Sequence, residues 1–172
     1  ACQSAGREDW GNLEYLMDTA FQAGLNVSEL SMENIGWDGQ ELVDLNEKTI
    51  QHLFKLYPWE WVWEEDFSQF LTPQTEWIEP CWKMLLSNKA LLIELWKRFP
   101  NHPLLLESHA YDPKQHYAGK WVRKPILARE GANIHILQNN VDCGSASGSF
   151  YFDDYDKHGY VMQRWVKTPL HQ

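Results

Sequence analysis

The apolar positions at the start of the chain follow a helical spacing. Apolar residues recur every three or four positions from residue 10 to residue 23, and Gly24 follows the run. With Asp9 as its cap, this pattern predicts a helix that stops at the glycine. The next segments alternate between apolar and polar residues, which is typical of short strands. We expect strands over 26–32 and 42–45 with a turn at 37–39 between them, and either a strand or a helix over 49–56.

The middle of the chain is rich in aromatic residues and has the spacing of several short helices. After Pro58, indoles and carboxylates interleave, and we expect one helix to run from there through Phe70. Proline is favoured in the first turn of a helix, so Pro80 predicts a second helix. A third is expected over 89–99, where Pro100 ends it.

From residue 120 onward the pattern changes to strands, after a polar loop over 111–119. The run 160–165 is rich in β-branched and aromatic residues and is the strongest strand prediction in the chain. Other strands are expected over 121–124, 134–137 and 150–152, with a Gly/Ser-rich turn over 142–148. Helices followed by strands of this kind predict an α+β fold.

Charge divides the chain into two parts. Residues 1–66 hold 14 Asp and Glu against 3 Lys and Arg, whereas residues 67–172 hold 10 against 12. We therefore interpret 1–66 as an acidic helix and strand unit that ends in the Trp-rich cluster, and 67–172 as a second part with a different surface. A solvated acidic surface explains the first part equally well. No basic nucleic-acid motif, membrane span or signal peptide is found, so we expect a cytoplasmic protein that binds neither nucleic acid nor membrane.

The cysteines and the aromatic cluster suggest alternatives that the residues alone leave open. Cys2, Cys81 and Cys143 are too widely spaced for a disulfide framework or a structural zinc site, and Cys81 is expected to be a buried, inert thiol. The 10 tryptophans fit a thick core better than a ligand platform. Glu60 and Glu64 could serve as a glycosidase carboxylate pair, but they are also an ordinary solvated pair one helical turn apart.

Two lysines and one loop have the chemistry of a phosphate site. Lys89 precedes a predicted helix, Lys124 ends a predicted strand, and the loop 128–133 follows Lys124 at once. Phosphates need point cations and a loop of small residues whose backbone N–H groups can approach them. On spacing alone, however, a lone lysine is more often a solvated surface residue than a ligand.

Four segments together resemble the glutathionylspermidine synthase family. Residues 53–61 read LFKLYPWEW, and residues 77–89 read WIEPCWKMLLSNK. Residues 122–134 contain the pattern VRKPxxxREGANI, and residues 7–16 read REDWGNLEYL. The four segments occur in the order found in that family and extend over essentially the whole chain.

The resemblance implies a fragment of an ATP-grasp ligase that joins a carboxylate to an amine through an acyl phosphate. It implies ATP and Mg²⁺ as cofactors, and as partners a thiol peptide or another carboxylate together with a polyamine-like amine. Metal ligands are expected outside this chain, which we expect to be a piece of a longer protein and inactive by itself. The alternative is a non-catalytic, Trp-rich binding module derived from the same fold. By motif, ATP binding is assigned to Lys89, Lys124, Gly131, Ala132 and Gln163, and a catalytic role in the lid loop 128–133 to Arg129.

Overall fold

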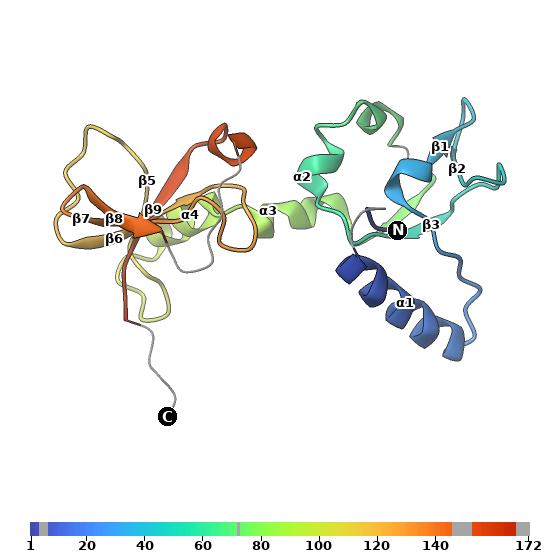
Figure 1. Ribbon diagram of the computed structural model, residues 1–172, viewed down its shortest axis with the longest axis horizontal. Coiled ribbons are helices and arrows are strands. Elements are labelled where there is room, and N and C mark those ends of the chain that lie inside the picture. The colour runs from blue at the N-terminus through green and yellow to red at the C-terminus, as the bar shows by residue number, and fades with distance from the viewer. Residues whose placement is uncertain (4–6, 72, 146–152, 168–172) are drawn as a thin grey trace. The chain divides into compact units, whose positions relative to one another are not determined.

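The computed structural model describes residues 1–3, 7–71, 73–145 and 153–167. These residues form helices, short parallel strands and an antiparallel sheet (Figure 1), which confirms the α+β class. The chain divides into two compact units, Ala1–Met84 and Leu85–Gln172. The division expected at residue 66 was drawn from charge, and it stays a prediction about the surfaces of the chain.

The first unit begins with the predicted helix. Helix α1 spans Arg7–Gln22, so it starts earlier than expected and ends within one residue of the prediction. Its end has the hydrogen bonds of a Schellman motif, in which Gly24 N–H donates to Phe21 O at 2.9 Å and Leu25 N–H donates to Ala20 O at 3.1 Å. Gly24 has a φ of +84°, the left-handed conformation that glycine adopts without a steric penalty.

In the first unit, the segments before and after α1 pair in parallel. Cys2 forms parallel bridges with Ser31 on one side and with Leu56 on the other, so α1 connects two neighbouring parallel segments. The strands β3 (His52–Phe54) and β4 (Glu76–Ile78) also pair in parallel. The predicted strand over 26–32 was wrong, because only Ser31 forms a bridge there and η1 (Met32–Asn34) is a short 3₁₀ helix. β4 was not predicted, since a three-residue strand leaves no measurable alternation.

The predicted turn at 37–39 is confirmed as the connection of a hairpin. Strands β1 (Gly36–Trp37) and β2 (Leu42–Val43) pair in antiparallel fashion. One carboxylate oxygen of Asp38 accepts the backbone N–H groups of Gln40 and Glu41, each at 2.8 Å. An aspartate that satisfies local N–H groups in this way stabilises the turn at its own position.

The aromatic segment does not form the single helix that we expected through Phe70. Instead α2 (Trp59–Val62) makes one turn, and η2 (Asp66–Phe70) is a separate 3₁₀ helix. Glu65 between them is extended, and its carboxylate accepts a hydrogen bond from the Tyr57 hydroxyl. The break lets Phe67 pack near Trp77, with ring centroids 6.4 Å apart. The buried core of this unit consists of Ala1, Met32, Leu53, Trp59 and Val62.

Short helical segments connect the two units in sequence. The region after Pro80 forms η3 (Cys81–Lys83) and α3 (Met84–Ser87), and the predicted third helix is α4 (Ala90–Arg98). Asn88 Oδ1 accepts the N–H of Ala90 at 2.9 Å, so the asparagine side chain satisfies one of the free backbone N–H groups in the first turn of α4.

The second unit contains a five-stranded antiparallel sheet with the strand order β5-β9-β6-β7-β8. Its strands are β5 (Ser108–Ala110), β6 (Lys120–Pro125), β7 (His135–Gln138), β8 (Val141–Ser145) and β9 (Tyr160–Arg164). The strands expected over 121–124, 134–137 and 160–165 are confirmed. The one expected over 150–152 lies outside the described residues.

Strand β8 corrects the prediction of a Gly/Ser-rich turn over 142–148 for residues 142–145, and residues 146–148 lie outside the described part of the chain. The chain turns earlier, at Asn139 and Asn140, whose φ values are +49° and +68°. Two consecutive left-handed residues suit a tight hairpin, and asparagine tolerates that conformation. The turn therefore leaves residues 141–145 free to pair with β7, although they include Gly144.

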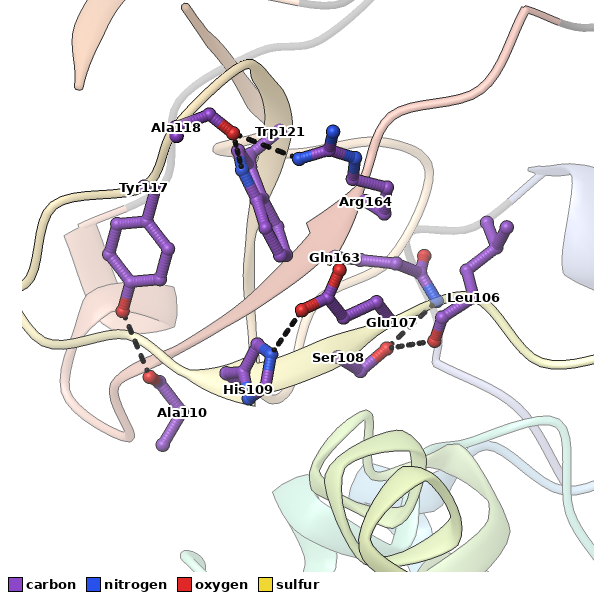
Figure 2. Close-up of polar contacts among 10 residues, drawn as sticks. All are labelled: Leu106, Glu107, Ser108, His109, Ala110, Tyr117, Ala118, Trp121, Gln163 and Arg164. Carbon is purple, nitrogen blue, oxygen red and sulfur yellow. Dashed lines mark hydrogen bonds and ion pairs between the residues drawn. The ribbon is translucent and has the colours of Figure 1, made fainter. Parts of the chain in front are cut away.

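The two faces of this sheet have different roles. Residues paired across antiparallel strands share a face, and Trp121 pairs with Leu137 in β7 and with Arg164 in β9. This face packs against Tyr117 and Met162 to form a small core. Figure 2 shows the ring of Trp121 with Tyr117, whose hydroxyl donates to Ala110 O at 3.2 Å. The loop 111–119 thus covers this face, and the opposite face carries Lys124 and Gln163 beside the apolar Val122 and Val161.

Candidate functional site

Three polar side chains lie on the other face of the sheet, one on each of three adjacent strands. Val122 pairs with Gln163, and Gln163 pairs with Ser108, so Lys124, two residues beyond Val122, has the same orientation. The Lys124 ammonium donates to Gln163 Oε1 at 2.7 Å. Gln163 Nε2 lies 3.3 Å from Ser108 Oγ, which donates to Leu106 O at 2.9 Å (Figure 2). The structure therefore brings together Lys124 and Gln163, which we had assigned to one site by motif.

The charge of Lys124 is the main electrostatic feature of this face. Burial lowers the pKa of the Lys124 ammonium below its usual 10.5, because removal from water disfavours the charged form. Within the part of the chain that the structure describes, its hydrogen-bond partner is the neutral amide of Gln163, and no carboxylate forms an ion pair with it. A half-buried cation with a neutral partner favours an anionic ligand, since the ligand would supply the missing negative charge.

Lys89 is connected to the loop that follows β6. Its ammonium donates to Ala128 O at 2.8 Å, and its backbone N–H donates to Ile126 O at 3.0 Å. The start of α4 is thereby joined to the segment that begins just after Lys124. Both lysines consequently lie on structure that borders the loop 128–133.

The loop 128–133 is tighter than its small residues suggested. Ala132 N–H donates to Arg129 O at 2.9 Å, and Ala132 and Asn133 are buried. Asn133 Nδ2 donates to Asp156 Oδ1 at 2.8 Å, which joins the second half of the loop to the short 3₁₀ helix η4 (Asp153–Asp156). Gly131 has a φ of +77°, so a larger residue would be strained there. Arg129 is exposed in the first half. The lid role assigned to this loop stays a prediction.

Two functional details were missed from the sequence. No sequence pattern indicated Ser108, because β5 has only three residues and the residues on either side of Ser108 are polar. Arg123 was not distinguished from Lys124, although period-two alternation places it on the opposite face. Its guanidinium carbon lies 5.4 Å from the ring centroid of Tyr111 and 4.9 Å from that of Tyr160. Arg123 therefore contacts the covering loop at Tyr111, whereas Lys124 lies on the other face of the sheet.

The aromatic cluster of the first unit forms core packing. Trp59 is 4% exposed, and its ring centroid lies 5.0 Å from that of Trp77. The Lys55 ammonium lies 4.1 Å above the Trp59 ring. Cys81, in contrast, is exposed, so the expectation of a buried thiol was wrong. The residue begins the short helix η3, which lies outside the core.

The described residues contain neither a metal-ligand cluster nor a membrane-spanning helix. Among them, no group of three or more His, Cys, Asp or Glu side chains is placed to hold a metal ion. The helices of the described part are all too short or too polar to cross a bilayer.

The fold and the site together define an α+β chain with a half-buried lysine, hydrogen-bonded to a neutral amide, on one face of its sheet. Residues 1–172 match in full the family described as "Glutathionylspermidine synthase preATP-grasp", and the chain belongs to this family. The resemblance drawn from the four sequence segments is thereby confirmed. The family description does not itself place the ATP-grasp fold within these residues.

Relatives with enzyme names support this membership. A protein of Haemophilus influenzae, described as an inferred acid–amine ligase, is 47% identical over 98% of this chain and 44% of its own length. A bifunctional glutathionylspermidine synthetase/amidase of Escherichia coli is 24% identical over 80% of the chain and 26% of its own length. A trypanothione synthetase of Crithidia fasciculata is 25% identical over 62% of the chain. The chain thus spans less than half the length of these relatives.

Proposed function

We propose that this chain is part of an ATP-dependent carboxylate–amine ligase of the ATP-grasp fold. Lys124 and Lys89 bind the phosphates of ATP, and Gln163 lies where the base is held. Gly131 and Ala132 belong to the loop 128–133 that closes over the nucleotide, and Arg129 acts there on the transferring phosphoryl group. The observation that carries the proposal is the half-buried Lys124 ammonium, whose described partner is a neutral amide 2.7 Å away.

The positions of Lys124 and Gln163 suit one end of a nucleotide. The α-phosphate is the phosphate nearest the base. Because the Lys124 ammonium lies beside the Gln163 amide, the ammonium can contact the α-phosphate while the amide contacts the base. The Gln163 amide has both donor and acceptor capacity, which a base edge requires. The loop 128–133 follows β6, and Lys89 is joined to it by the hydrogen bond to Ala128 O, so both are proposed for the more distal phosphates.

The proposed reaction has two steps. A carboxylate oxygen of the acid attacks the γ-phosphorus of ATP, the bond to the bridging oxygen breaks, and ADP leaves with an acyl phosphate remaining. The amine then attacks the acyl carbon, inorganic phosphate leaves, and the nitrogen loses a proton to give the amide. Cationic side chains stabilise charge that develops on the transferring phosphoryl group, which is the role proposed for Arg129 and Lys89.

The remaining participants follow from the relatives' names. We propose a thiol peptide or a similar acid and a polyamine-like amine as substrates, with the cytoplasm as the compartment. Mg²⁺ is proposed to accompany ATP, but the described residues provide no ligand group for it. We propose that its ligands come from other parts of the ligase.

The alternative, a non-catalytic Trp-rich binding module, has less support. Such a module needs its indoles on the surface, whereas Trp59 is buried against Trp77. The cations that the ligase reaction needs, Lys89, Lys124 and Arg129, are all present.

Turnover of the ligase that contains this chain tests the proposal directly. With ATP, glutathione and spermidine as probe substrates, we expect ADP and phosphate to be released in equal amounts and only when both the acid and the amine are present. The control is the Arg129→Met variant, which should bind ATP and release little phosphate. Phosphate release that needs neither acid nor amine would show an ATPase and contradict the ligase assignment.

The pH dependence of ATP affinity gives a second prediction, specific to Lys124. Its pKa in the free protein is lowered from 10.5, and bound phosphate raises it again, so ATP binding takes up a proton at alkaline pH. ATP affinity should therefore fall as the pH rises through the lowered pKa towards 10.5. Unfolding of the protein would not explain this fall in ATP affinity. A lysine whose pKa is lowered in the folded state makes that state more stable as the pH rises over the same range.

The matched control for this titration is Lys124→Arg, which keeps its charge throughout the pH range. Calorimetric titration with ATP should show a steeper loss of affinity for the wild type than for the arginine variant. Identical pH profiles would mean that Lys124 does not contact phosphate.

A further inference from the structure

The C-terminal half of α1 has an apolar surface that the first unit leaves open. The apolar positions of α1 share one side of the helix, namely Leu13, Leu16, Met17, Ala20 and Phe21. Leu13 is buried at 4%, but Leu16 is 40% exposed and Phe21 is 71% exposed. The helix is therefore packed near its N-terminal half and open along its C-terminal half.

The end of the helix extends this apolar surface. In a Schellman motif the residue after the left-handed glycine folds back towards the last turn, and here that residue is Leu25. Leu25 is 59% exposed, and Val27 follows at 38%. We call Leu16, Phe21, Leu25 and Val27 the α1 patch. Four exposed apolar side chains within twelve positions are a surface that soluble proteins usually cover with a partner.

The charges on α1 make a second copy of the chain a poor occupant for the patch. The helix contains Glu8, Asp9, Glu14 and Asp18, and its basic residue is Arg7. An isologous contact between two such helices would bring like charges together, because each helix meets the same surface of its partner. A surface with an apolar centre and basic residues around it is the complementary partner.

We infer that the α1 patch packs against the part of the ligase polypeptide that lies outside residues 1–172. The Haemophilus influenzae relative matches 98% of this chain with 44% of its own length, so more than half of that relative has no counterpart here. A contact of this kind within one polypeptide covers Phe21 and Leu25 permanently. The inference depends on the family membership and is independent of the proposed ATP site.

Photo-cross-linking in the intact ligase tests this contact. Phe21 is replaced by p-benzoylphenylalanine, which keeps an aromatic side chain at the position, and the product is irradiated, digested and sequenced by mass spectrometry. We expect cross-links to peptides outside residues 1–172. The control places the same residue at Gln22, which lies next in sequence on the polar side and should give at most weak cross-links.

Each other outcome contradicts the inference. Cross-links to residues 85–172 would assign the patch to the second unit. Cross-links between differently isotope-labelled copies would assign it to a dimer, and no protein cross-link at Phe21 would leave the patch exposed to solvent.

A paired substitution provides a second measurement on the same protein. Lysine at the last turn of a helix interacts favourably with the helix dipole, so Phe21→Lys and Gln22→Lys should affect α1 itself equally. We expect Phe21→Lys to lower the urea midpoint of the intact ligase and Gln22→Lys to leave it unchanged, at every protein concentration. Equal midpoints, or a Phe21→Lys loss that depends on protein concentration, would overturn the inference.

Discussion

Replacing Lys124 by methionine in the ligase should weaken ATP binding roughly tenfold to a hundredfold and leave folding nearly intact. A charge-assisted hydrogen bond to phosphate is typically worth about 1.5–3 kcal/mol, which corresponds to that loss in affinity. Folding should change little, because burial already opposes the charged form of Lys124 and its hydrogen bond is to a neutral amide. Methionine keeps most of the length of the side chain and removes the charge together with the N–H donors. ATP affinity by calorimetry and the urea midpoint are the two measurements.

Lys120 is the matched control for this experiment. It lies four residues earlier in β6, so it has the same orientation, and its ammonium lies 3.9 Å above the ring of Trp165. Lys120→Met should leave ATP affinity within about twofold of the wild type, since a screened charge away from the site contributes little. If Lys120→Met and Lys124→Met weaken ATP binding equally, the effect is one of general surface charge, and the assignment of Lys124 fails. If Lys124→Met unfolds the protein, the residue is structural and the assignment fails as well.

The Trp59→Ala variant should lose about 3–5 kcal/mol of stability, the usual cost of truncating a buried tryptophan. Trp59 is 4% exposed, its indole N–H donates to Glu79 O at 3.3 Å, and its ring packs on Trp77. The variant would lose these contacts together and leave a cavity beneath the Lys55 ammonium. The urea midpoint should fall accordingly, while ATP affinity of the remaining folded protein should be unchanged.

Trp63 provides the control, because it belongs to the same cluster and is 48% exposed. Its ring centroid lies 6.3 Å from that of Trp59, so alanine at this position removes one ring contact and little buried surface. Trp63→Ala should shift the urea midpoint much less than Trp59→Ala. Similar shifts of the urea midpoint would mean that the exposed fraction of the side chain does not determine how much stability each substitution costs. A Trp59→Ala variant that keeps its midpoint and loses activity would show that the cluster binds substrate.

The site was predicted from motifs more fully than from physical patterns. Lys124 and Gln163 lie 39 positions apart, and no spacing rule connects them. Their hydrogen bond exists because β6 and β9 pair in a particular antiparallel register. Ser108 joins them only through the pairing of β5 with β9, and a three-residue strand is too short to carry a pattern. Resemblance found the lysine and the glutamine because it compares residues without needing their contacts.

The sequence alone determined the features that depend on neighbouring residues. The spacing of apolar positions and Gly24 were sufficient for α1, Asp38 for the hairpin turn, and the β-rich run for β9, because local hydrogen bonds and sterics dominate in such segments. The four family segments also established membership without any structure.

In segments where contacts distant in sequence compete with local preference, only the tertiary structure decided the conformation. The segment after Pro58 has a helical pattern, yet Phe67 packs near Trp77 only if the chain is extended at Glu65. The parallel bridges of Cys2 and the burial of Ala132 likewise depend on segments distant in sequence. The Lys124 pKa is lowered for the same reason, since the burial of its ammonium exists only in the folded chain. Packing free energy summed over many distant contacts exceeds the small propensities that a sequence pattern records.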